Sequence, residues 1–91
     1  MKRAYIITYE LYKQGQNYEK LIQRIKSYGT WARLGGSEYI VISTQSAVEI
    51  RDYLSIVIDN NDSIFVGTLI APAAWNGMTE EVSNWIRNNL N

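Results

Sequence analysis

The middle of the chain reads TWARLGGSEYIVISTQSAVE, residues 30–49, and it combines a β-hairpin with the start of a helix. Two runs of strand-forming residues, 30–34 and 38–44, flank the turn sequence Gly35-Gly36-Ser37. Ser46 and Glu49 have the spacing of a capping box, in which the serine hydroxyl and the glutamate carboxylate bond each other's free backbone amides. The stretch therefore predicts two strands and a helix, in that order.

One strand and one helix are predicted before this stretch. Residues 4–9 are mostly β-branched and aromatic, which is typical of a strand. Apolar residues then recur at helical spacing through 18–28, and Asn17 suits the N-cap of that helix. Gly29 stands where a helix commonly ends on a left-handed residue.

Another strand and two helical segments follow from the residues after the hairpin. The apolar stripe behind Ser46 continues to about Asp59. Residues 64–70 predict a strand that stops before Pro72, because proline cannot continue a central ladder. Thr79 suits the N-cap of a last helix, which has two glutamates in its first turn.

The predicted order is β-α-β-β-α-β with an additional C-terminal helix. Right-handed crossovers joined through one hairpin give a four-stranded antiparallel sheet in the order 4-1-3-2, with both main helices on one face. This is an α+β, ferredoxin-like sandwich. We expect residues 1–91 to form a single domain of this kind, because the chain holds no linker-like segment.

The composition restricts the chemistry that is open to the protein. The chain has no cysteine and no histidine, which excludes thiolate nucleophiles, Cys-based zinc sites and imidazole bases. Nine basic residues balance nine acidic ones, so a strong non-specific field for DNA is not expected. The first apolar run is too short for a signal sequence or a membrane span, so a cytoplasmic location and no membrane partner are expected.

The sheet face that the two main helices leave free needs a cover. In strands 38–44 and 64–70 both alternating sets of side chains are apolar, which is typical of strands buried on both faces. In strand 4–9, either Tyr5 and Tyr9 or the alternate residues could face the helices. Two candidates could cover this face: the C-terminal helix through Trp85 and Ile86, or a second copy of the chain in a sheet-to-sheet homodimer.

Three carboxylates are candidates for a metal site. The strand order brings the end of the first strand, the hairpin and the turn at residues 59–62 to one end of the sheet. Glu10, Asp59 and Asp62 could together hold Mg²⁺ or Mn²⁺, which prefer oxygen ligands, and the metal could activate water for attack on a phosphodiester. The alternative is that Asp59 and Asn60 end the second helix, Asn61 and Asp62 form a turn through side chain to backbone bonds, and Glu10 is a solvated strand end.

Three tyrosines are candidates for a binding face. Tyr5, Tyr9 and Tyr39 could stack RNA bases, as aromatic residues do on the central strands of RNA-recognition modules. The alternative is that they pack in the core or in a dimer contact. The RNA-binding hypothesis fails if this face is buried.

The chain carries short segments at 5–11, 15–18, 29–31, 46–52 and 73–75, which read YIITYEL, GQNY, GTW, SAVEIRD and AAW. Together they resemble a family of small bacterial and phage proteins that often carry the SinR-family label. That family is related to the CRISPR-associated adaptation nuclease-like proteins and to VapD. The resemblance implies a ferredoxin-like homodimer that acts on or near RNA or DNA.

In the catalytic members of this family, the resemblance implies a metal-binding aspartate at the end of the first strand. The matching position here is Glu10, whose side chain is one methylene longer. The sequence thus leaves two hypotheses: a metal-dependent phosphodiesterase of weak activity centred on Glu10, or a non-catalytic accessory module of a phage or mobile element. The second would bind a host protein or a nucleotide.

Overall fold

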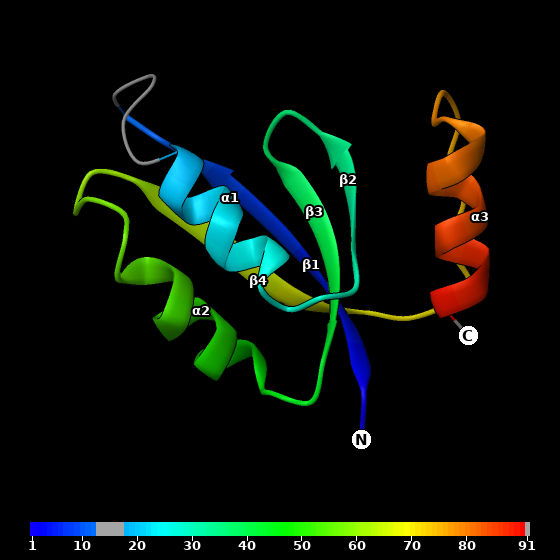
Figure 1. Cartoon of the computed structure of the whole chain (residues 1–91), viewed down its shortest axis with the longest axis horizontal. Helices are drawn as coiled ribbons and strands as arrows, with labels where there is room; N and C mark the ends of the chain where they lie inside the picture. The colour runs from blue at the N-terminus through cyan, green and yellow to red at the C-terminus, as the bar shows by residue number, and fades with distance from the viewer. Residues whose placement is uncertain (13–17, 91) are drawn as a thin grey trace.

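The computed structural model describes residues 1–12 and 18–90. Asn17, the predicted N-cap, and Gly15 lie outside the described residues. The elements follow the predicted order and confirm the α+β, ferredoxin-like arrangement with an extra C-terminal helix (Figure 1). They are β1 (Arg3–Glu10), α1 (Tyr18–Lys26), β2 (Trp31–Gly35), β3 (Glu38–Ser43), α2 (Ala47–Ser55), β4 (Ser63–Leu69) and α3 (Glu80–Asn89).

The four strands form one antiparallel sheet in the order β2-β3-β1-β4, which is the predicted order read from the other edge. The register places Ile6 of β1 opposite Ile40 of β3 and Gly67 of β4. Helices α1 and α2 lie on one side of the sheet and α3 lies on the other (Figure 1). We call these sides the inner and the outer face.

The inner face holds the main core. Tyr5, Ile7 and Tyr9 of β1 point toward α1 and α2, where they pack with Leu21 of α1 and Leu54 of α2. This settles which set of β1 side chains faces the helices, because the side chains of a strand point to opposite faces in turn.

The outer face has a smaller core beneath α3. Ile86 of α3 is buried against Ala4 and Ile40, and Trp85 packs at the edge of this cluster. The C-terminal helix therefore covers this face, but only in part, since the side chain of Phe65 on β4 is 62% exposed. The expectation that β4 is buried on both faces is wrong, because α3 packs over the β2 side of the sheet.

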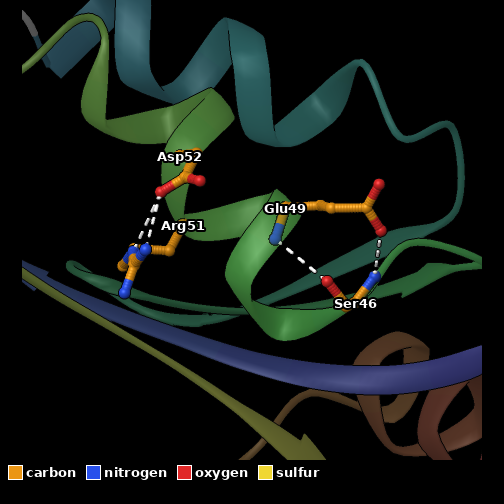
Figure 2. Close-up of polar contacts among 4 residues, drawn as sticks. All are labelled: Ser46, Glu49, Arg51 and Asp52. Atoms are coloured by element: carbon orange, nitrogen blue, oxygen red, sulfur yellow. Dashed lines mark hydrogen bonds and ion pairs between the residues drawn. The ribbon is translucent and has the colours of Figure 1, made fainter.

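The start of α2 has the predicted capping box. Ser46 Oγ accepts a 3.1 Å hydrogen bond from the Glu49 amide, and Glu49 Oε1 accepts one of 2.8 Å from the Ser46 amide (Figure 2). One turn further on, Arg51 and Asp52 form an exposed ion pair of 2.8 Å, which contributes little to stability. Helix α2 ends at Ser55, earlier than the predicted Asp59.

The remaining helix signals are also found. Gly29 has a φ of +87°, the left-handed conformation expected after α1. Thr79 caps α3 by accepting a hydrogen bond from the Val82 amide. None of the described helices is both long and apolar enough to span a membrane.

Candidate functional site

A hollow of about 480 Å³ lies at the end of the sheet where β1 finishes, and it contains residues from several distant segments. The predicted convergence of these segments is confirmed, because antiparallel neighbours bring the end of β1, the β2–β3 hairpin and the start of β4 together. The hollow is lined by Thr8, Tyr9, Glu10, Tyr18, Ser37, Glu38, Ser63, Ile64 and Phe65.

The sheet register explains the outer side of this hollow. Thr8 stands opposite Glu38 on one side and Phe65 on the other, so all three side chains share the outer face. Glu10 stands opposite Ser63, two pairs further along. This end of the outer face therefore combines two exposed carboxylates, hydroxyl groups and one exposed aromatic ring.

The two carboxylates come from different strands. The Glu38 carboxylate lies over Gly35, in the space that a side chain at that position would need. Glu10 is exposed at the last position of β1. Among residues 1–12 and 18–90, the charged side chains that line the hollow are both acidic, and hydroxyl oxygens lie beside them. This part of the surface therefore favours cationic ligands.

The inner side of the hollow is formed by tyrosines. The Tyr9 hydroxyl donates a 3.3 Å hydrogen bond to the Gly36 carbonyl, and its ring lies 6.1 Å from that of Tyr18. Burial, together with the neighbouring Tyr39, raises the pKa of Tyr9. A tyrosine is protonated at neutral pH even at its ordinary pKa, so this hydroxyl acts as a donor there.

The hairpin glycines form a turn, and their carbonyls are already bonded. Arg33 donates from Nε to the Gly35 carbonyl and from a terminal nitrogen to the Gly36 carbonyl, both at 3.1 Å. Its guanidinium group also lies over the Tyr39 ring, 5.4 Å from the centre. Arg33 is thus held against the hairpin rather than turned toward the acidic side of the hollow.

The predicted metal site does not assemble within one copy of the chain. Both carboxylate oxygens of Asp62 accept backbone hydrogen bonds of 2.7 Å, one from Tyr12 and one from Asp59. Among residues 1–12 and 18–90, no group of three acidic side chains comes together in a way that could hold a metal ion. The structure thus supports the turn-stabilising interpretation of Asp62.

The three candidate tyrosines lie in the core. Tyr5, Tyr9 and Tyr39 are at most 5% exposed, because they point toward α1 and α2. Their assignment to an accessible nucleic-acid or dimer face is therefore corrected, since a base cannot stack on a ring that helices cover. The core-packing alternative describes all three.

Glu38 and Phe65 are among the residues of the hollow that the sequence does not identify. Phe65 belongs to a strand with apolar residues at both alternating positions, and that pattern conceals which side chain is exposed. Glu38 could have been found from the hairpin register, which sets it opposite Thr8 and near the end of β1.

Comparisons with models of known protein families and with well-characterised proteins give no match for this chain. The resemblance suggested by its short motifs stays a prediction.

Proposed function

We propose that this protein is a non-catalytic interaction module that binds a partner protein through the uncovered part of its outer face. The binding surface consists of Ile6, Thr8, Phe65 and Gly67, with Glu10 and Glu38 at one end. We call it the open outer face. The observation that carries the proposal is the 62% exposure of Phe65 beside an acidic hollow.

The chemistry of this surface indicates what the partner presents. An exposed aromatic ring gains free energy when it is buried in a contact, and aromatic residues often dominate the affinity of an interface. Carboxylates at the rim favour cationic groups and discourage anionic ones. The best match is a protein segment that places an aliphatic or aromatic side chain on Phe65 and a lysine or arginine beside Glu10.

A peptide array tests this proposal. Synthetic peptides that pair an apolar residue with lysine or arginine are compared with the same peptides carrying glutamate. We expect wild-type protein to bind the basic set, with affinity that falls as salt rises. Phe65→Ser should weaken binding at least about tenfold, and Glu10→Gln should reduce its salt dependence.

The matched control is Ile56→Ser, which removes another exposed apolar side chain just after α2. Binding by this variant should equal that of the wild type. Equal binding to the basic and acidic peptide sets, or full binding by Phe65→Ser, would contradict the proposal.

A second candidate function is metal-dependent phosphodiester hydrolysis centred on Glu10. Its support is the exposed carboxylate at the end of β1, in a hollow that also offers hydroxyl oxygens from Thr8, Ser37 and Ser63. Further ligands would come from a second copy of the chain or from the substrate. The expected result is cleavage of single-stranded RNA or duplex DNA that Mg²⁺ or Mn²⁺ stimulates and that Glu10→Ala abolishes.

Glu19→Ala is the control for that assay, because it removes an exposed carboxylate of α1 that does not line the hollow. Cleavage that survives in Glu10→Ala would count against this second function.

A further inference from the structure

Strand β4 is an edge strand that, in the described part of the chain, has neither a charge nor a proline nor a register irregularity to protect it. It lies at the end of the sheet and pairs with β1 on one side only within the described part of the chain. Its sequence, SIFVGTL, contains no charged residue and no proline. Natural proteins usually protect such an edge with charges, proline, bulges or a covering segment, because free backbone groups invite pairing with another strand.

The other edge of the sheet has three of these protections: a charge, a register irregularity and a covering helix. Strand β2 carries Arg33 and has a register irregularity between Arg33 and Gly35. Helix α3 also packs beside it, with Val82 and Trp85 near Trp31. The contrast singles out β4 as the edge that is open for pairing.

The hydrogen bonds show which groups of β4 point outward. The Tyr9 amide donates a 3.1 Å bond to the Ser37 carbonyl, so the backbone groups of Tyr9 face β3. Backbone groups alternate along an antiparallel strand, so those of Thr8 face β4, where Phe65 is the partner. The amides and carbonyls of Ile64, Val66 and Thr68 must then point away from the sheet.

We infer that two copies of this chain pair through their β4 strands, antiparallel, about a two-fold axis at Val66. In this register Val66 stands opposite Val66 of the second copy, and Ile64 stands opposite Thr68. Every outward amide and carbonyl of these three residues then finds a partner, and the two sheets become one. A two-fold axis suits the pairing because each copy contributes the same strand.

The side chains and charges fit the same register. On the outer face Phe65 comes opposite Gly67 of the second copy, and the missing side chain leaves room for the two rings to meet across the axis. Lys2 and Arg3 lie near Leu69, whereas Glu10 lies beside Ser63. Antiparallel pairing therefore sets the basic end of one copy toward the acidic end of the other.

This pairing does not depend on the proposed partner-binding function, and it differs from a sheet-to-sheet dimer. The two Glu10 residues would be separated by about 20 Å along the strand direction alone, at 3.4 Å per residue. They could not share a metal ion, so edge pairing and a metal centre built from two Glu10 residues exclude each other.

Sedimentation of the full chain over a concentration series tests the inference. The wild type should sediment at twice 10.5 kDa. Thr68→Lys places a charge on the exposed edge, and we expect it to raise the dissociation constant of the dimer about tenfold or more. Thr44→Lys is the matched control, because Thr44 is also exposed but lies after β3, and its dimer should be unchanged.

Amide hydrogen exchange provides a second and independent readout. The amides of Ile64, Val66 and Thr68 should become protected as the concentration rises, whereas those of Phe65 and Gly67 should be protected at every concentration. A wild type that stays monomeric would overturn the inference. So would a dimer that persists in folded Thr68→Lys, or protection of the outward amides that does not vary with concentration.

Discussion

The ring of Phe65 lies over Gly67, so closely that a Cβ atom at position 67 would stand 2.8 Å from Cε1 of the ring. The two residues are two positions apart on β4 and therefore share the outer face. Because Gly67 has no side chain, the ring can lie directly against the backbone at this position. The Phe65 side chain remains 62% exposed there. An apolar surface is thus held in a defined position at the free edge of the sheet.

Gly67→Ala should displace this ring without unfolding the protein. The exposed ring can turn away from the new methyl group, so we expect the free energy of unfolding to change by less than about 1 kcal/mol. Self-association should weaken about tenfold, because the second copy's ring loses its space as well. Chemical denaturation and sedimentation measure the two effects.

Gly36→Ala is the control for this substitution, since a Cβ atom there meets nothing within 4 Å. Unchanged self-association of Gly67→Ala would show that the ring and the glycine play no part in pairing.

Tyr39→Phe should leave the fold as stable as before or more stable. The Tyr39 ring is fully buried, and its hydroxyl has no hydrogen-bond partner among the described residues. Removing an unpaired buried hydroxyl relieves its desolvation cost, so the gain should reach about 1 kcal/mol. Urea denaturation at neutral pH measures it.

Tyr5→Phe is the matched control on the same face. The Tyr5 hydroxyl donates a 2.6 Å hydrogen bond to the Gln45 carbonyl, so losing it should cost about 1 kcal/mol. If Tyr39→Phe is destabilised as much as Tyr5→Phe, the Tyr39 hydroxyl has a partner after all.

Most of the fold could be predicted because local signals and connectivity agree. The capping box at Ser46, the left-handed Gly29 and the hairpin glycines each indicate the element that the structure contains. The order of the elements then determines the sheet. Alternation could not settle which face of β1 the helices cover, because both sets of its side chains include apolar residues.

The sequence could predict where the hollow lies but only part of its lining. The strand order brought Glu10 to the hollow, as expected. The strand order could not show that the Asp62 carboxylate accepts hydrogen bonds from two backbone amides. Those bonds depend on how the chain turns after α2 and on where Tyr12 lies. The exposure of Phe65 depends on how far α3 extends across the sheet, and no local pattern reports that.

Asp62→Asn should destabilise the turn before β4. One of the two carboxylate oxygens would be replaced by an amide group that cannot accept from Tyr12 or Asp59, so one charge-assisted bond of 2.7 Å is lost. Because the turn is exposed, the expected cost is about 1 kcal/mol. The midpoint of urea denaturation measures it.

Asp59→Asn serves as the control, since its exposed side chain lies in the same turn. Added Mg²⁺ should not shift the wild-type midpoint if Asp62 is a turn residue. Stabilisation of the wild type by Mg²⁺ that is absent in Asp62→Asn would instead support the metal site.

Stability should fall in alkaline solution partly because of Tyr28. Burial, and then the nearby Tyr53 and Glu49, raise the pKa of Tyr28 to about 12, from an ordinary value near 10. The folded protein therefore keeps this proton at a pH where the unfolded chain has lost it. The stabilisation is complete below pH 10 and is lost as the pH rises through 12.

Tyr28→Phe should reduce this alkaline loss of stability. The variant forfeits the 2.8 Å hydrogen bond to Gln45 at neutral pH, but it has no proton to lose at high pH. Part of the fall in unfolding free energy with rising pH should remain, because burial also raises the pKa of Tyr9 and of Tyr39. Urea denaturation between pH 9 and pH 12 gives the slope of the unfolding free energy against pH. Tyr12→Phe is the control, because the Tyr12 side chain is 72% exposed. Equal slopes for Tyr28→Phe and wild type would mean that Tyr28 does not carry this effect.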